Sequence, residues 1–226
     1  EKDYSAEANF FTKLIKKYKK TKGNNFLDTA CGTGKHIKYF KQDFETKGID
    51  LSKELLTIAR NKNPDVNFEV ADMTKFKALE KYDVITCLFS SIAYIKSDEK
   101  LEEFVKNSYN NLKLGGFFLI ATLYLKGKFS GVKNHIRFYK DKNLTLKRTT
   151  NISVGSDIAT IKSIYEITEN GETKKVIKDE HILQLYDEKE LILLMESVGF
   201  KVQTFVYKQI GTTIFLGVKA KTVNLL

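Results

Sequence analysis

The chain has 226 residues, 42% of them hydrophobic and 29% charged, which suits one large domain or one domain with a sizeable insertion. Its longest apolar run, Phe117 to Leu125, is too short to span a bilayer, and no signal peptide is visible, although residue 1 is not a methionine. Cys31 and Cys87 show neither metal-ligand spacing nor a disulfide pattern. We therefore expect no membrane partner, no metal site and a location in the reducing cytoplasm.

The net charge of +10 makes nucleic acid a candidate partner. However, the only arginines are Arg60, Arg137 and Arg148, and arginine is the residue favoured for recognising bases and phosphates. The lysines are spread along the chain, with one dense run in KLIKKYKKTK. Apolar residues recur there at helical spacing, namely Phe10, Phe11, Leu14, Ile15 and Tyr18. This stretch is interpreted as an amphipathic helix with a solvated basic face, so nucleic acid is not the expected partner.

Apolar strands and periodic helices alternate up to about residue 125. Strands are predicted at residues 25–30, 45–50, 66–72, 81–90 and 117–125. Helices are predicted from Lys35, over residues 52–62 with Ser52 as N-cap, and over residues 98–112. Their inward-facing residues are expected to be Leu55, Ile58 and Ala59 in the second helix, and Leu101, Phe104, Val105 and Leu112 in the third. Repeated strand–helix units with short connections predict a parallel, doubly wound sheet.

The pattern changes over residues 132–186, where period-2 runs are separated by the hairpin-like turns KDKN, GSD and ENGE. This segment is predicted to be an antiparallel insertion. An amphipathic helix from Asp187 to Val198, with Gly199 as C-cap, and strands at residues 201–208 and 212–220 follow it. The predicted fold is α/β, with a Rossmann-like seven-stranded, mostly parallel sheet, helices on both faces, and an antiparallel β insertion after the fifth strand.

A glycine-spaced turn, LDTACGTGKH, follows the first predicted strand, and Asp28, Asp50 and Asp72 stand at or near the ends of the first three strands. In an open α/β sheet, ligands bind outside the carboxyl ends of the strands, so these three acids should converge on one crevice. A phosphate-binding loop is excluded because Gly34-Lys35 is followed by a histidine and no glycine lies five residues earlier. A dinucleotide fingerprint lacks its third glycine, since that position is Ile37.

Three segments resemble motifs of the class I S-adenosylmethionine-dependent methyltransferases: LDTACGTGKH, GIDLS and VADM. The resemblance implies that S-adenosylmethionine is the cofactor and that Ala30, Gly32 and Gly34 line its methionine and ribose portion through their backbone. It further implies that Asp28 anchors the turn and approaches the cofactor ammonium, and that Asp50 accepts both ribose hydroxyls. Asp72 and the Met73 amide would contact the adenine, which Leu51 and Met73 would sandwich. A cationic sulfonium cofactor needs carboxylates and backbone groups rather than a phosphate cradle.

Further segments, EKDYSAEA, LFSSIAYIK and DEHILQLY, resemble small N-methyltransferases that dimethylate nucleotide-linked amino sugars, with parts shared by glycine N-methyltransferases. The resemblance implies one methyltransferase domain over residues 1–226, with residues 132–186 as a substrate lid. Tyr4 would approach the methionine end of the cofactor, and Phe89 and Ser90 would flank it. Two features depart from the amino-sugar enzymes: ATLYLKG stands where they carry a glutamate and paired tryptophans, and an upstream tyrosine-rich segment is missing.

The expected reaction is methyl transfer to a small-molecule acceptor, with an amine nitrogen favoured over a hydroxyl. Positioning alone can supply roughly 7–11 kcal/mol of such a barrier, and a base matters most when the amine arrives protonated. His181 and Tyr94 are the candidate catalytic residues, because histidine titrates near neutrality and Tyr94 follows the fourth strand. Other candidate acceptor contacts are His36, Tyr124, His135 and Arg137. A nucleic-acid or protein methyltransferase, a cofactor-binding protein without catalysis, and a homodimer remain open.

Overall fold

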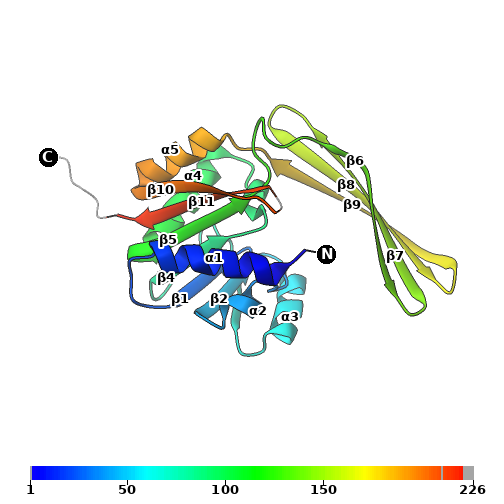
Figure 1. Cartoon of the computed structure of the whole chain (residues 1–226), viewed down its shortest axis with the longest axis horizontal. Helices are drawn as coiled ribbons and strands as arrows, with labels where there is room; N and C mark the ends of the chain where they lie inside the picture. The colour runs from blue at the N-terminus through cyan, green and yellow to red at the C-terminus, as the bar shows by residue number, and fades with distance from the viewer. Residues whose placement is uncertain (1, 210, 221–226) are drawn as a thin grey trace. The chain divides into compact units, whose positions relative to one another are not determined.

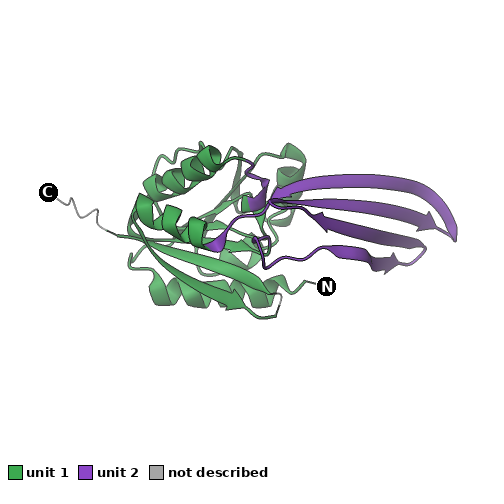
Figure 2. Ribbon diagram, turned by 90° about the horizontal axis from the view of Figure 1, so that it is seen from above, with its two compact units in different colours: residues 1–92, 97–123, 189–226 green, residues 93–96, 124–188 purple. Residues whose placement is uncertain are grey.

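The computed structural model describes residues 2–209 and 211–220 of the chain. The chain divides into two compact units, which Figure 2 draws in separate colours. Unit 1 comprises residues 1–92, 97–123 and 189–226, and unit 2 comprises residues 93–96 and 124–188. Across the described residues, no helix combines the length and the apolar character that crossing a membrane requires.

Unit 1 is built on a seven-stranded sheet with the strand order β10-β11-β5-β4-β1-β2-β3 (Figure 1). The strands β1 to β5 pair in parallel, whereas β11 runs antiparallel to both β5 and β10. This confirms the predicted Rossmann-like, mostly parallel sheet. The strands are β1 (Asn25–Thr29), β2 (Glu45–Asp50), β3 (Asn67–Val70), β4 (Tyr82–Cys87), β5 (Leu112–Thr122), β10 (Phe200–Tyr207) and β11 (Thr212–Lys219).

Helices cover both faces of this sheet. Phe117 of β5 belongs to the same buried cluster as Phe11 in the first helix, α1, whereas the ring of Phe118 lies 5.6 Å from that of Phe104 in α4. Because successive strand residues point to opposite faces, α1 and α4 lie on opposite sides of β5. The helices are α1 (Tyr4–Tyr18), α2 (Ile37–Phe40), α3 (Lys53–Lys62), the 3-10 turn η1 (Ser91–Tyr94), α4 (Asp98–Asn111) and α5 (Glu188–Val198).

The predicted inward face of α3 was partly wrong. Ala59 is buried as expected, but Leu55 and Ile58 are 38% and 42% exposed, and Leu56 is buried in their place. A helix turns by about 100° per residue, so Leu56, Ala59 and Asn63 form one stripe and Leu55 points away from it. Asn63, buried just beyond the last turn, extends this stripe toward the glycine turn.

Two helix boundaries also differ from the prediction. The helix α2 begins at Ile37 rather than Lys35, because Lys35 and His36 belong to the turn that follows the glycines. The helix α4 ends at Asn111, and the buried Leu112 instead starts β5, where it pairs with Tyr82 of β4. The chain is therefore already extended when it reaches the LGG segment, which lies inside the strand rather than ending the helix.

Unit 2 contains a four-stranded antiparallel sheet with the order β6-β7-β8-β9. This confirms the predicted antiparallel insertion after the fifth strand. One end of the sheet buries Ala159, Ile161 and Leu183 against Ala93 and Leu185, which gives unit 2 a small core of its own. The strands are β6 (Val132–Asp141), β7 (Leu144–Val154), β8 (Ile158–Glu169) and β9 (Glu172–Gln184).

Candidate active site

The turn after β1 holds its backbone in a conformation that suits glycine. Ala30, Gly32 and Gly34 have φ values of 53°, 55° and 66°. A Cβ added at Gly34 would lie 3.0 Å from Asn63 Nδ2 and 3.3 Å from the Phe68 ring, so the turn packs closely against α3 and β3 there. A Cβ added at Gly32 would meet nothing within 4 Å. The turn therefore leaves open space at Gly32, where backbone could approach a ligand.

The first two acids lie beside this turn. Asp50 Oδ2 accepts a hydrogen bond of 2.8 Å from the Gly32 N–H, and its Oδ1 accepts one of 2.9 Å from the Ser52 N–H. Asp28 is buried, and it accepts a hydrogen bond of 2.7 Å from the Thr86 hydroxyl of β4. The carboxylate of Asp50 thus lies against the glycine turn at Gly32, where the turn leaves open space.

The third acid ends the neighbouring strand. The Ala71 N–H donates to the Asp50 carbonyl at 3.1 Å, which places the end of β3 beside the end of β2. Asp72 Oδ1 accepts from both the backbone N–H and the hydroxyl of Thr74, each at 2.9 Å. Asp72 therefore caps a local turn at the same carboxyl edge of the sheet as Asp28 and Asp50.

The electrostatics of Asp28 favour a positively charged ligand. Burial raises the pKa of Asp28 to about 7, the Thr86 hydrogen bond opposes that rise, and the nearby charge of Asp50 adds to it. Two carboxylates that repel each other in this way are stabilised by a cation between or beside them. A sulfonium or ammonium group would supply that cation, whereas a phosphate would increase the repulsion.

Exposed apolar side chains follow the ends of β2 and β4. Leu51, directly after Asp50, is 69% exposed, and Phe89, beyond the end of β4, is 61% exposed. Phe89 and Ser90 both have positive φ values, 52° and 63°, and the buried Ser90 hydroxyl accepts from the Leu123 N–H at 2.9 Å. Such strained backbone is often found at functional sites. Met73, the other predicted adenine contact, is half-buried.

The N-terminal helix brings further predicted residues together. The Lys2 ammonium lies 4.8 Å from the centre of the Tyr4 ring and 3.8 Å from that of Phe89. Buried Glu7 Oε2 lies 2.7 Å from Lys2 Nζ and 2.5 Å from His36 Nε2, and the Tyr4 ring meets His36 edge-on. Tyr4 and Phe89 thus flank one cation. His36, proposed as an acceptor contact, is instead buried against Glu7, and burial lowers its pKa.

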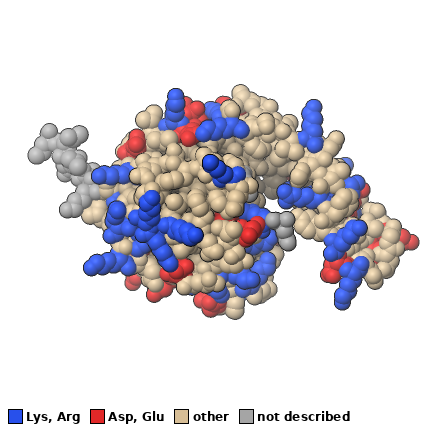
Figure 3. All heavy atoms as spheres, viewed as in Figure 1, with Lys and Arg blue, Asp and Glu red and all other residues tan. Residues whose placement is uncertain are grey.

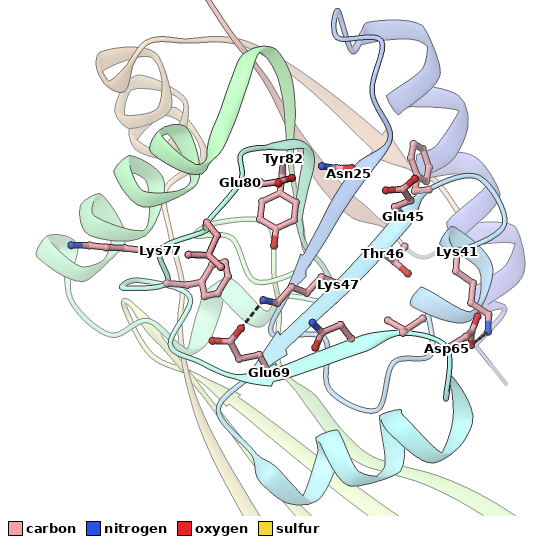
Figure 4. Close-up of a pocket in the computed structure, with 15 residues that line it drawn as sticks. Asn25, Lys41, Glu45, Thr46, Lys47, Asp65, Glu69, Lys77, Glu80 and Tyr82 are labelled. Atoms are coloured by element: carbon pink, nitrogen blue, oxygen red, sulfur yellow. Dashed lines mark hydrogen bonds and ion pairs between the residues drawn. The ribbon is translucent and has the colours of Figure 1, made fainter.

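A separate hollow of about 950 Å³ lies at the other edge of the sheet, at the amino ends of β1 to β4 (Figure 4). Ion pairs of 2.6 Å between Lys47 and Glu69 and of 2.7 Å between Lys41 and Asp65 stand on its walls. None of the predicted cofactor residues lines it. The carboxyl edge, and not this hollow, carries the candidate cofactor site.

Unit 2 holds the two predicted catalytic residues in one hydrogen-bonded chain. The Tyr94 hydroxyl lies 3.0 Å from His181 Nδ1, and His181 Nε2 lies 2.9 Å from Asp179 Oδ2. An imidazole that donates from Nε2 to Asp179 presents Nδ1 as an acceptor to Tyr94. Burial raises the pKa of Tyr94, and the charge of Asp179 raises it further. The trio can therefore pass a proton between the phenol and the imidazole.

The remaining acceptor candidates also lie in unit 2. Tyr124 is half-buried; burial and Tyr94 raise its pKa, whereas the Arg148 charge lowers it. His135 and Arg137 are exposed on β6, where Arg137 Nε donates to His135 Nε2 at 3.0 Å. Sequence reasoning missed Thr86, Asp179 and Arg148 as parts of these arrangements, although the alternation of a strand places Asp179 on the same face as His181.

The sheet order, together with a glycine turn and three acids at the carboxyl edge of the strands, defines a protein with a Rossmann-like fold. Residues 26–116 match a family described as a methyltransferase domain. A dTDP-3-amino-3,4,6-trideoxy-alpha-D-glucopyranose N,N-dimethyltransferase from Streptomyces venezuelae is 26% identical over 97% of this chain and 92% of its own.

Solved structures agree with this similarity. Streptomyces venezuelae DesVI superposes with a TM-score of 0.89 at 26% identity, covering 97% of this chain and 93% of its own. The SAM-bound amino pentose methyltransferase CalS10 from Micromonospora echinaspora shares the fold, with a TM-score of 0.87 at 18% identity over 97% of this chain and 92% of its own. The chain is an S-adenosylmethionine-dependent methyltransferase.

Proposed function

We propose that this enzyme methylates the amine of a nucleotide-linked amino sugar. The observation that carries the proposal is the extent of the similarity to the amino-sugar N,N-dimethyltransferase, which covers 97% of the chain. The methyltransferase domain match ends at residue 116, so the longer similarity includes unit 2 and its candidate acceptor residues. The position of ATLYLKG, without tryptophan or glutamate, implies an acceptor pocket that differs in detail from that of the amino-sugar enzymes.

S-adenosylmethionine supplies an electrophilic methyl group carried by a positively charged sulfur. For this chain we propose that Asp50 holds the ribose hydroxyls, and that Ala30, Gly32 and Gly34 present backbone to the ligand. Asp28 and Asp50 would provide a negative potential that favours a cation; burial is the main cause of the raised pKa of Asp28, and the charge of Asp50 adds to it. Leu51, Asp72 and Met73 would hold the adenine, and Tyr4, Phe89 and Ser90 would enclose the methionine end.

The acceptor nitrogen must be neutral when it attacks, and amines are largely protonated near neutral pH. We propose that Tyr94 takes the proton from the ammonium while its own hydroxyl proton passes to His181 Nδ1, which lies 3.0 Å away. Asp179, 2.9 Å from His181 Nε2, then stabilises the imidazolium. Each residue thus has one role: Tyr94 removes the proton, His181 stores it, and Asp179 orients and stabilises the ring.

Residues 132–186 are proposed to act as the substrate lid of a single methyltransferase domain spanning residues 1–226. Both cysteines are unpaired thiols, which supports the proposed cytoplasmic location. A small-molecule acceptor remains the proposed partner in place of nucleic acid, and a homodimer remains a proposal.

The test combines binding with turnover. Calorimetry should detect S-adenosylhomocysteine binding to the wild type and a large loss of affinity in Asp50→Ala. Mass spectrometry of a dTDP-linked amino sugar after incubation with S-adenosylmethionine should show one or two added methyl groups. Cofactor binding without methylation of any amine in a panel of amino sugars and amino acids would contradict the proposal and favour a cofactor-binding protein without catalysis.

A further inference from the structure

Two of the three arginines in the chain stand opposite each other in unit 2. The register of the β6–β7 hairpin pairs Arg137 directly with Arg148. Like charges at directly opposed positions of an antiparallel pair destabilise the sheet. A chain with 38 basic residues and only three arginines therefore places two of them where their mutual repulsion is greatest.

The arginine pair lies on the same face of the sheet as two hydroxyl residues. Arg148 donates a hydrogen bond of 3.3 Å to Ser163 Oγ, which lies 3.1 Å from the Thr150 hydroxyl. The Arg148 guanidinium also lies 5.5 Å from the centre of the Tyr165 ring. These contacts fix the guanidinium, yet its Nε–H is buried and has no hydrogen-bond partner. Arg148 is therefore held in place on this face of the sheet by Ser163 and Tyr165.

Two lysines on the opposite face of the same sheet are paired with glutamates. There Lys147 pairs with Glu166 at 2.7 Å and Lys162 with Glu180 at 3.7 Å, each across two neighbouring strands. By contrast, in residues 2–209 and 211–220 no carboxylate lies within 4.0 Å of Arg137 or Arg148. Arg137 and Arg148 thus oppose each other across two strands with no described carboxylate paired to either of them, which leaves both guanidinium charges available to an anion.

We propose that Arg137 and Arg148 bind the diphosphate of the nucleotide-linked substrate. This inference rests on the proposed function, to which it adds the anchoring site of the substrate. A planar guanidinium binds two phosphate oxygens at once, and two of them facing one ligand match the charge of a diphosphate. His135 holds Arg137 through the 3.0 Å hydrogen bond from Arg137 Nε. A bound diphosphate would offset the repulsion between the two opposed guanidinium groups.

The position of the pair along the sheet suits such a substrate. Asp179 of the proton-transfer trio is directly opposite Ser163, the residue that Arg148 contacts. Arg148 and His181 stand two side-chain rows apart on the same face, about 13 Å along the strands, and the Arg148 side chain leans toward the trio. The pKa of Tyr124 is raised by Tyr94 and lowered by Arg148. A diphosphate at the arginines would leave its attached sugar close to Tyr94.

The experiment measures binding without catalysis. Calorimetry of the full chain with dTDP, inorganic pyrophosphate and thymidine is carried out for the wild type, Arg148→Gln, Arg148→Lys and Lys147→Gln. We expect dTDP and pyrophosphate, but not thymidine, to bind the wild type, and Arg148→Gln to weaken dTDP about tenfold or more. Arg148→Lys should recover little of this loss, because lysine lacks the planar guanidinium that binds two phosphate oxygens at once. Lys147→Gln, on the neighbouring residue of the opposite face, should bind dTDP as the wild type does.

Three results would overturn the inference: no dTDP binding by the wild type, equal losses in Lys147→Gln and Arg148→Gln, or tighter binding of a short single-stranded oligonucleotide than of dTDP. S-adenosylhomocysteine titrated into the same four proteins separates the two proposals. If it binds all of them and the dTDP-linked amino sugar is methylated while dTDP binds none of them, the diphosphate site fails and the proposed function stands. If it binds none, the proposed function fails on its own evidence.

Discussion

Asp28 is a buried carboxylic acid that accepts a hydrogen bond from a neutral hydroxyl, that of Thr86. Its pKa of about 7 means that the folded protein binds a proton there which the unfolded chain, with an ordinary acid, releases at much lower pH. The sign follows from linkage: stability from this group is fully present below the ordinary pKa and is lost as pH rises toward 7. The loss approaches roughly 4 kcal/mol, at about 1.4 kcal/mol per tenfold change in proton affinity.

We predict that Asp28→Asn removes this pH dependence. Urea unfolding at several pH values should show the wild type losing stability relative to Asp28→Asn between about pH 4 and pH 7, with no further divergence above. Asp65→Asn is a suitable control, because Asp65 is exposed and pairs with Lys41 far from Asp28 in the sequence. If the free energies of unfolding of the wild type and Asp28→Asn instead vary with pH in parallel, folding does not raise the pKa of Asp28.

We also predict that Asp28 releases a proton when the cofactor binds. A cation bound beside Asp28 and Asp50 stabilises both carboxylates, so it lowers the pKa of Asp28 from about 7. The affinity for S-adenosylmethionine should therefore rise with pH between about 6 and 8. Calorimetry in buffers of different ionisation enthalpy counts the released protons directly. Asp28→Asn should release fewer, and an unchanged count would remove Asp28 from the cofactor site.

His181 carries the prediction for the reaction itself. If it stores the acceptor proton, His181→Gln should lower kcat by about 10²–10⁴-fold near neutral pH, with a smaller effect on KM. This deficit should shrink as pH rises, because solvent then delivers the amine already neutral. Glu180→Gln, on the adjacent residue and the opposite face of β9, is the matched control. A deficit of constant size at every pH would assign His181 to substrate binding instead.

At the scale of elements, two glycines of the turn after β1 are expected to have different roles: Gly34 in packing and Gly32 in ligand binding. Gly34→Ala meets Asn63 and Phe68 as well as an unfavourable φ, and should cost about 2–4 kcal/mol of stability. Gly32→Ala faces open space and should cost only about 1–2 kcal/mol, from its φ alone. Its Cβ would stand where the ligand approaches, so the Gly32 variant should lose more S-adenosylhomocysteine affinity than stability. Urea unfolding and calorimetry of the two variants provide the comparison.

The strands and their order of appearance were predictable because burial and alternation are local properties of the sequence. The KDKN turn also sets the register of β6 and β7. Because Asp141 pairs with Leu144, the loop between them has two residues, and counting back along both strands places Arg137 opposite Arg148. The acids at the ends of β1, β2 and β3 were found for the same reason, since parallel strands share one carboxyl edge.

Other features depend on contacts that no local pattern contains. The hydrogen bond between Thr86 and Asp28 joins residues that are 58 positions apart in the sequence, and the one between Glu7 and His36 joins residues 29 positions apart. The face of α3 was misjudged by one residue, because Leu55 and Leu56 have equal hydrophobicity and only tertiary packing chooses Leu56. For Asp28 and His36 the partner was missing from the sequence-based prediction, and for α3 the wrong leucine was chosen.

At the scale of the whole molecule, we expect the cofactor product to slow amide exchange in unit 1 and the nucleotide part of the acceptor to slow it in unit 2. A ligand slows amide exchange most where it stabilises the folded state. S-adenosylhomocysteine should protect the segment from β1 to α2 in unit 1, and dTDP should protect β6, β7 and β8 in unit 2. Hydrogen exchange followed by mass spectrometry checks both. Protection by dTDP confined to unit 1 would contradict the diphosphate site.

The net charge of +10 belongs to the whole molecule and leads to the last prediction. Figure 3 shows basic side chains over both units on the visible face, with acidic ones between several of them. Charge dispersed in this way attracts polyanions through screened, nonspecific forces, and only a set of simultaneous phosphate contacts would give a steep dependence on salt. The protein should therefore bind heparin at low salt, leave it at modest salt, and transfer no methyl group to RNA. Retention at high salt, or methylated RNA, would make nucleic acid the acceptor in place of an amino sugar.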